Sequence, residues 1–365
     1  MRPTGGASCR MHKRLAAVSV LLLTAWRCPG GSSSEGVSAT KHFAGSFVID
    51  QAAARADLDF IAAEPHPFGS ARQSVVADYL ARRASEARAR TFIQKFDADI
   101  PNPRALFAPA ELTRKVSGRN VFAWPDRWND SVARNSGGRL SCVVMFGSHY
   151  DTKHVEGIRY TGANDSGSSS VALLQMLRHL ADATPPAGLQ CGFVFVWFDG
   201  EESTLPEWDG GETNFPVRIV DHTWGSRHAA GKVGPAAMMG EESGAKAAVK
   251  LSAMVLLDMV GSPDLRLTDD LLSNSAMREL KKVAVQGLGL PAGTLSGYSV
   301  PVEDDHKPFL DIGVPALNII DFNDVSVWHR EGDEPARVNP KSIEKSIKIA
   351  LFVAHTVAID PQAIR

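Results

Sequence analysis

Apolar and polar positions alternate with helical periodicity in three segments of the chain. Residues 72–90, 168–181 and 340–358 each place apolar side chains on one face, with charged or polar residues opposite. Asn339 is well suited to cap the last of these helices, and Pro340 suits its first position.

Four continuous apolar runs predict strands that are buried on both faces. They span residues 142–147, 191–198, 251–260 and 315–320. Because strands and helices alternate, we expect a single-domain α/β/α sandwich with a central mixed, mostly parallel sheet flanked by helices. Two segments, 203–223 and 232–248, break this rhythm, and we expect both to be surface insertions.

The longest apolar run lies near the start of the chain. Residues 15–25 follow a basic segment and are too few for a settled transmembrane helix, a pattern typical of a signal peptide. We therefore expect export, with a signal peptide over 1–28, a flexible linker over 29–45 and a catalytic domain over 46–362. An uncleaved anchor or a lipid on Cys28 would instead tether the protein to a membrane. No later segment is apolar enough to predict a transmembrane span in the mature chain.

Composition excludes several classes of protein. The chain has 39 Lys and Arg against 41 Asp and Glu, and a net charge of −2 offers no electrostatic reason to bind nucleic acid. Four cysteines in 365 residues cannot be the main source of stability. Cys142 and Cys191 could form a disulfide if their strands are neighbours, or remain two buried thiols. We expect His12, His42 and His66 to lie at the surface.

Ionisable residues follow each of the predicted buried strands, where open α/β sheets bind their ligands. The set comprises His149, Asp165, Glu201, Glu202, Asp258, Asp321 and His329. Each alone has an ordinary explanation: Asp165 could cap a helix, Asp258 could bind loop amides, and His149 could be a core histidine. Their coincidence at one edge of the sheet favours a functional site.

Imidazole and carboxylate ligands without paired cysteines suit a zinc ion with an open coordination position. Glu201 and Glu202 are adjacent and cannot point the same way, so one can ligate a metal while the other acts as a general base. The motifs of serine hydrolases, P-loop enzymes, HExxH proteases and CxxC oxidoreductases do not occur in the sequence.

At these residues the chain resembles the glutaminyl-peptide cyclotransferases and their relatives, the co-catalytic zinc aminopeptidases of the bacterial leucyl aminopeptidase type. The resemblance covers about residues 50–360. The matching segments occur in order at residues 149–153, 162–166, 198–202, 224–228, 256–261, 303–310, 313–315 and 328–329.

The resemblance implies a role for each of the clustered residues. Three of them would hold a catalytic zinc ion: Asp165, Glu202 and His329. Glu201 would be the general acid/base, and Asp258 and Asp304 would form a hydrogen-bonded carboxylate pair that assists it. Trp328 and Trp208 would shape the substrate pocket.

The resemblance leaves three functions open, two of which would act on the N-termini of peptides or proteins. In a cyclase, one zinc would polarise the γ-carbonyl of an N-terminal Gln, and Glu201 would carry a proton from the α-amine to the departing ammonia. In an aminopeptidase, His149 and Asp258 would help to bind a second zinc, and Glu201 would activate water. The third function is a catalytically silent ectodomain. We favour the cyclase, because Asp199-Gly200, the segment 303–306 and Trp328 resemble that family. We expect the protein to be a monomer.

Several positions depart from the pattern of the animal cyclases. Ser148 and Ser170 replace a cysteine pair, so that disulfide is absent. Asn318 stands in place of a pocket histidine, and Asp324 replaces a pocket aromatic residue. With Ser148 and Ser170 in place of the cysteine pair, we expect an exported cyclase to rely on its core and its metal for stability.

Overall fold

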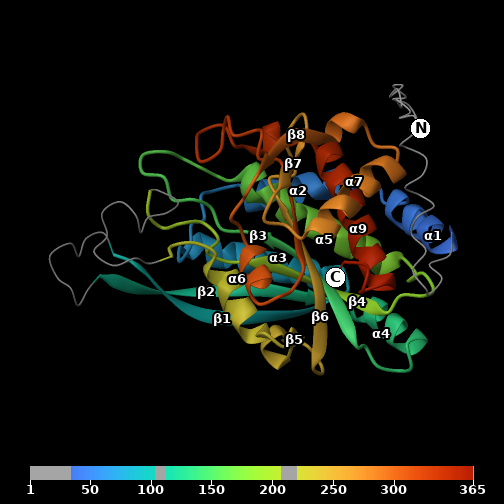
Figure 1. Ribbon diagram of the computed structural model, residues 1–365. Coiled ribbons are helices and arrows are strands. Elements are labelled where there is room, and N and C mark those ends of the chain that lie inside the picture. Colours follow the sequence, from blue (N-terminus) through green and yellow to red (C-terminus); the bar gives the residue numbers. More distant parts are fainter. Residues whose placement is uncertain (1–33, 103–111, 207–219, 365) are drawn as a thin grey trace, which may run out of the picture.

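The main sheet is mixed, and its four central strands run parallel. The computed structural model describes residues 34–102, 112–206 and 220–364, and Figure 1 shows their arrangement. Within these residues the sheet order is β1-β2-β4-β3-β6-β5, and β9 also pairs with β6. The strands are β1 (Arg90–Pro101), β2 (Thr113–Trp124), β3 (Cys142–His149), β4 (Cys191–Phe198), β5 (Met238–Met239), β6 (Val249–Asp258) and β9 (Ala316–Ile320). The pairs β4–β3, β3–β6 and β6–β9 are parallel, whereas β1, β2 and β5 pair antiparallel.

Helices cover both faces of this sheet, which confirms the predicted sandwich. The α-helices of the described residues are α1 (Ser34–Gly45), α2 (Gln51–Ile61), α3 (Ala71–Glu86), α4 (Asp126–Asn135), α5 (Ser169–Asp182), α6 (Trp224–Val233), α7 (Ser275–Gly287), α8 (Lys307–Asp311) and α9 (Pro340–Ile359). Further helical turns are η4 (Ala163–Ser168), η5 (Glu241–Ser243), η6 (Ala292–Thr294) and η7 (Pro335–Arg337). A second, two-stranded sheet pairs β7 (Leu267–Asp270) with β8 (Leu295–Val300).

Alternating side chains of the central strands supply two separate apolar cores. In β4, Phe193 and Phe195 pack into the core beneath α2–α5 and α9. Val194 and Val196 point the other way, into the core beneath α6 and α8. Burial on both faces explains why the parallel strands form unbroken apolar runs in the sequence.

The expected strands and helices are present, with small shifts at their ends. Asn339 caps α9, because its side chain accepts a hydrogen bond from the N–H of Lys341 at 3.0 Å. Patterning missed the hairpin of β1 and β2. These strands interleave charged residues and pair with each other in register from end to end. It also missed β5, which adds Met238 and Met239 to the sheet within the expected surface insertion 232–248.

The expected linker is wrong for residues 34–45, because these form α1. Phe43 packs against Trp128 and His355, and the Thr40 hydroxyl lies 2.8 Å from Nδ1 of His355 on α9. The expected surface position is also wrong for His66, which is buried and hydrogen-bonds the carbonyl of Glu64. The predicted signal peptide, residues 1–28, lies outside the described residues, and so does most of the insertion 203–223.

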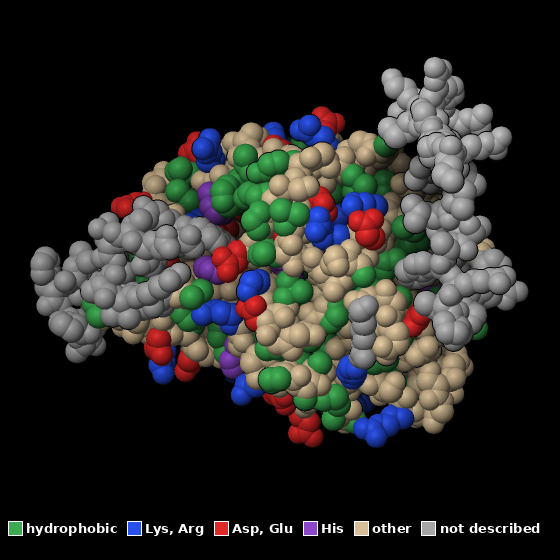
Figure 2. Space-filling view, viewed as in Figure 1, with side chains coloured by type: hydrophobic (Ala, Val, Ile, Leu, Met, Phe, Trp, Pro, Cys, Tyr) green, Lys and Arg blue, Asp and Glu red, His purple; other side chains and the backbone are tan. Residues whose placement is uncertain are grey.

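No helix among the described residues is long and apolar enough to cross a membrane. On the face that Figure 2 shows, Lys and Arg are interspersed with Asp and Glu, and neither sign dominates a large area. This distribution fits the near-neutral net charge of −2.

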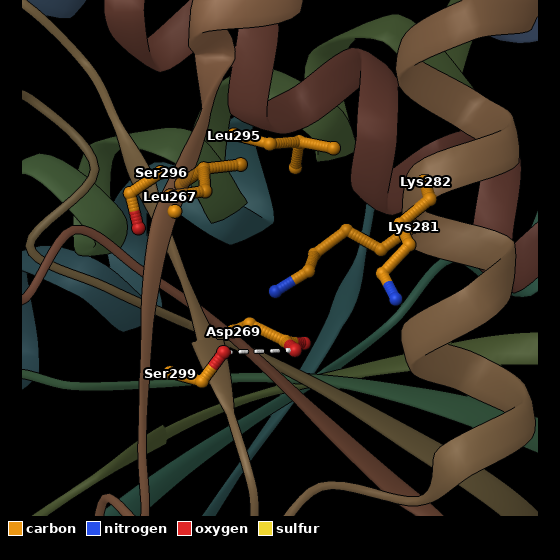
Figure 3. Close-up of a pocket in the computed structure, with 8 residues that line it drawn as sticks. Leu267, Asp269, Lys281, Lys282, Leu295, Ser296 and Ser299 are labelled. Carbon is orange, nitrogen blue, oxygen red and sulfur yellow. Dashed lines mark hydrogen bonds between the residues drawn. The ribbon is translucent and has the colours of Figure 1, made fainter.

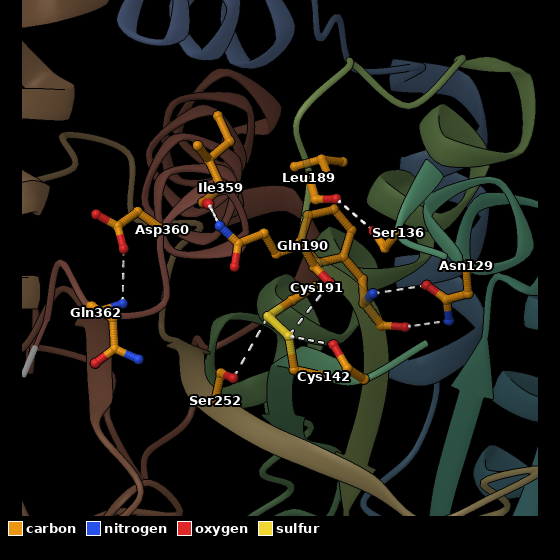
Figure 4. Close-up of a disulfide and its surroundings, with 12 residues drawn as sticks. Asn129, Ser136, Cys142, Leu189, Gln190, Cys191, Ser252, Ile359, Asp360 and Gln362 are labelled. Carbon is orange, nitrogen blue, oxygen red and sulfur yellow. Dashed lines mark hydrogen bonds between the residues drawn. A yellow bond between two sulfur atoms is a disulfide. The ribbon is translucent and has the colours of Figure 1, made fainter. Parts of the chain in front are cut away.

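Cys142 and Cys191 form a disulfide, which decides between the two alternatives that the sequence left open. The two residues face each other at the beginnings of the parallel strands β3 and β4, with 4.6 Å between their Cα atoms (Figure 4). The bond therefore joins the amino ends of two central strands, and the core is not the only source of stability.

Replacing both cysteines by serine (C142S with C191S) should destabilise the protein without changing its site. The disulfide closes a loop between positions 49 residues apart, for which chain entropy predicts a loss of about 4 kcal/mol in the free energy of unfolding. Urea unfolding of the parent and the double variant measures this loss, with the reduced parent as the control. Equal unfolding midpoints for the three samples would show that the bond contributes nothing.

Candidate active site

The predicted site residues meet at the carboxyl ends of the parallel strands. His149 ends β3 and Asp258 ends β6, while Glu201 and Glu202 follow β4 after a two-residue turn. Asp165 lies in η4, and His329 lies in the segment between β9 and α9.

Two buried triads share the carboxylate of Asp165 and could each hold a metal ion. One comprises His149, Asp165 and Asp258, and the other Asp165, Glu202 and His329; within each, the ligand atoms lie within 4.8 Å of one another. Oδ1 of Asp165 lies 3.1 Å from Nε2 of His149, and its Oδ2 lies 3.5 Å from Nε2 of His329. Nε2 of His329 is also 2.9 Å from Oε1 of Glu202. The structure thus brings together the residues that the resemblance implies as metal ligands.

The donor atoms fit a cation such as zinc. Within the described part of the chain, Oε2 of Glu202 and Oδ1 of Asp258 are buried and have no hydrogen-bond partner. A buried carboxylate oxygen without a partner is costly, and a bound cation would remove that cost. The mixture of imidazole and carboxylate donors also suits zinc.

The crowding of buried acidic groups shifts the pKa values of residues at the site. Burial raises the pKa of Glu201 well above its usual range, and the neighbouring carboxylate of Asp304 raises it further, while His149 opposes the shift. Burial opposes the charged form of His329, but the carboxylates of Glu202 and Asp165 outweigh burial and raise its pKa to about 10. The direction of its pKa shift favours the protonated form of Glu201.

Asp151 and Lys153 position the glutamate pair. The carboxylate of Asp151 accepts hydrogen bonds from the N–H groups of Glu201 and Glu202 at 3.0 and 3.2 Å. The buried ammonium of Lys153 donates to the carbonyls of Ser203 and Leu205, at 2.8 and 2.7 Å. The turn that presents the two glutamates is thus held by side chains from the loop after β3.

Gly200 makes this turn possible. Its φ is +68°, and an added Cβ would lie 2.9 Å from the ring of Phe68. A residue with a side chain would strain the backbone and collide with that ring.

Asp304 has two hydrogen-bond partners that the sequence did not indicate. Its Oδ2 accepts a hydrogen bond from Nδ2 of Asn318 at 2.8 Å, and its Oδ1 accepts one from the N–H of Asp305 at 2.6 Å. Burial and the nearby carboxylate of Asp258 raise the pKa of Asp304 well above its usual range. The two carboxylates are thus close enough to interact, but the described hydrogen bonds of Asp304 go to Asn318 and Asp305. Asn318, one of the positions at which the sequence departs from the animal cyclases, therefore contacts the site directly.

Trp328 forms part of an apolar wall beside His329. Its ring lies 4.3 Å from that of His329 and 5.3 Å from that of Phe322. It packs on a buried cluster that comprises Met259, Val302 and Ile320. Trp208 lies outside the described residues.

Asp324 holds the loop that carries Trp328. Both its carboxylate oxygens accept from Nη2 of Arg337 at 2.8 Å. The residue that replaces a pocket aromatic is thus engaged in an ion pair.

Two groups around Asp165 were missed in the sequence. The Tyr160 hydroxyl donates to Oδ2 of Asp165 at 2.7 Å, and Asp333 accepts from the backbone of the same loop. Tyr160 could have been found, because it precedes Asp165 by only five residues. The burial of Asp333 leaves no signal in the sequence around it.

A further pocket lies between β8 and α7 and has a different lining (Figure 3). Lys281 and Lys282 of α7 line it together with Ser296 and Ser299 of β8. None of the predicted site residues lines it, so this pocket is separate from the candidate site.

Curated relatives carry a consistent name. The chain is 25% identical over 295 residues to the glutaminyl-peptide cyclotransferase of Drosophila melanogaster, covering 75% of this chain and 72% of that protein. It is 28% identical over 234 residues to the glutaminyl-peptide cyclotransferase of Bos taurus, covering 56% of this chain and 60% of that protein.

Solved structures share the fold. An Acidobacteriales bacterium glutaminyl cyclase matches with a TM-score of 0.63 at 23% identity, covering 91% of this chain and 97% of that one. A Zn-dependent exopeptidase from Parabacteroides distasonis matches with a TM-score of 0.62 at 19% identity, covering 83% and 97%. The family described as peptidase family M28 matches residues 131–354, more than half of the 365 residues. The chain therefore belongs to peptidase family M28, and its relatives include glutaminyl-peptide cyclotransferases.

Proposed function

We propose that the chain is a zinc-dependent glutaminyl-peptide cyclotransferase that converts an N-terminal Gln of peptides to pyroglutamate and releases ammonia. The observation that carries this proposal is the position of Glu201, a buried acid/base immediately beside the triad of Asp165, Glu202 and His329. The names of the curated relatives support the cyclase over other activities of the family.

The triad would hold the zinc ion, whose chemistry is to polarise the γ-carbonyl of the substrate Gln. The carboxylate of Glu201 accepts a proton from the α-amine as its nitrogen attacks the γ-carbon. A new C–N bond forms, the bond to the side-chain amide nitrogen breaks, and Glu201 returns the proton to the departing ammonia. Asp304 stands beside Glu201 and raises its pKa, which favours the protonated form that the second step needs.

Cyclisation needs a site that keeps water away from the polarised carbonyl. Trp328 and Phe322 present an apolar wall next to His329, and Val302 packs beneath them. This wall would pack against the aliphatic part of the Gln side chain and exclude water from that side.

A second candidate function is a co-catalytic aminopeptidase. The observation that favours it is the second triad, His149, Asp165 and Asp258, which could hold another ion beside the first. In that enzyme Glu201 would activate a water molecule for hydrolysis of the N-terminal residue.

We further propose that the protein is exported. The basic and apolar pattern at the start of the chain supports this, and so does the disulfide of Cys142 and Cys191, because such bonds persist in oxidising compartments. Fractionation of the producing cells tests it: recovery of the full chain in the reducing cytosol, with both thiols free, would contradict export.

The zinc-loaded protein should cyclise a Gln-peptide and release one ammonia per pyroglutamate formed. It should leave Leu-p-nitroanilide intact and bind one zinc per chain. Mass spectrometry, an ammonia assay and metal analysis give the three measurements on one preparation. Hydrolysis of the anilide without cyclisation, together with two zinc ions per chain, would support the aminopeptidase instead.

Changing Glu201 to Gln should lower turnover about 10²–10⁴-fold, because the isosteric amide cannot carry the proton. Zinc content should remain that of the parent, since Glu201 lies outside the triad that would hold the ion. Changing Glu202 to Gln is the matched variant, and it should lose zinc. If E201Q is isolated without metal while E202Q keeps it, the roles within the pair are reversed.

A further inference from the structure

We propose that Asp333 is a positioning residue that fixes two ligand-bearing segments against each other, the one with Asp165 and the one with His329. The inference rests on the proposed function, because it concerns the residues that would hold the zinc. Asp333 lies between His329 and η7 and is 2% exposed.

The side chain of Asp333 binds the backbone of the Asp165 loop. Its Oδ1 accepts a hydrogen bond from the N–H of Asn164 at 2.7 Å, and its Oδ2 accepts one from the N–H of Asp165 at 3.1 Å. Two adjacent amides therefore bind the two oxygens of one carboxylate. An asparagine in its place offers only one acceptor oxygen and would turn an N–H group toward the other amide.

The main chain of Asp333 adds two more bonds to the same loop. Its carbonyl accepts from Oγ1 of Thr161 at 2.9 Å and from the N–H of Ala163 at 3.3 Å. Four hydrogen bonds thus link one residue of the C-terminal segment to residues 161–165.

These bonds set the position of two ligands at once. Asp333 follows His329 by four residues, so docking Asp333 onto the loop also brings the imidazole close. Nε2 of His329 then lies 3.5 Å from Oδ2 of Asp165. The loop is irregular at this point, since Asp165 has φ −109° and ψ 91° and is not helical within η4, and Asp333 accepts from the N–H groups of Asn164 and Asp165 there.

The carboxylate of Asp165 is held from a second direction. The hydroxyl of Tyr160 donates to its Oδ2, so Asp333 fixes the backbone of the ligand and Tyr160 orients the side chain. Burial and the nearby carboxylate of Asp165 raise the pKa of Asp333 to about 7, and the hydrogen bonds from the two amides offset only part of that electrostatic cost.

Changing Asp333 to Asn tests the proposal with zinc affinity as the readout. Competition with a chromogenic chelator should show a zinc dissociation constant raised about 10–100-fold, the range typical when a group that orients a metal ligand is lost. The stability of the metal-free protein, from urea unfolding, is measured in parallel.

Changing Asn129 to Asp is the matched control. Asn129 forms two 2.8 Å hydrogen bonds with the backbone of Phe193. Phe193 lies near the amino end of β4, whereas the proposed ligands lie at the carboxyl ends of the strands. Its isosteric replacement should lower stability to a similar degree while zinc affinity stays that of the parent. Changing Thr161 to Val removes one of the four bonds and should raise the dissociation constant less than D333N does.

Several results would overturn the inference. Unchanged zinc affinity in D333N would show that the clamp does not position the ligands. Equal loss of affinity in D333N and N129D would make Asp333 merely structural. If D333N fails to fold, T161V decides, because it should weaken zinc binding at parental stability. Absence of zinc binding by the parent protein would instead refute the proposed function.

Discussion

The concentration of buried carboxylates at one edge of the sheet is the constraint on which the site depends. Asp165 lies between His149 and His329, and Glu202 and Asp258 each have a buried oxygen without a hydrogen-bond partner in the described structure. Burying several negative charges together is unfavourable unless positive charge compensates them. The two imidazoles supply part of that charge, and a bound cation would supply the rest.

Other carboxylates of the chain hold the loops that carry these acidic side chains, by accepting hydrogen bonds from the backbone amides of the loops. Asp151 binds the N–H groups of Glu201 and Glu202, and Asp333 binds those of Asn164 and Asp165. In both cases a carboxylate from a distant segment satisfies two adjacent amides of an irregular loop. Loops that carry ligands have no helix or sheet ladder to fix them, so such clamps provide the rigidity that a metal site needs.

Strand ends could be predicted from the sequence, whereas contacts between distant loops could not. Burial on both faces produces continuous apolar runs, so the positions of His149 and Asp258 at the ends of β3 and β6 followed from patterning. The hairpin of β1 and β2 was missed because its strands interleave charged residues. The burial of Asp333 arises only when two segments 168 residues apart dock, and no local pattern records that. The disulfide likewise required knowing that β3 and β4 are neighbours.

Asp165 belongs to both triads, so the site could serve either of the two proposed reactions, cyclisation or hydrolysis. Both reactions need a polarised carbonyl and a proton carrier beside it, and Glu201 stands next to either triad. The difference between them is whether the nucleophile is the substrate's own amine or a water molecule. Here Trp328 and Phe322 form an apolar wall next to His329. The side-chain amide of Asn318, which does not titrate, donates a hydrogen bond to Asp304. In the proposed cyclase, proton transfer would therefore depend on Glu201 and its neighbouring carboxylates, and the apolar wall would favour attack by an amine that is already bound.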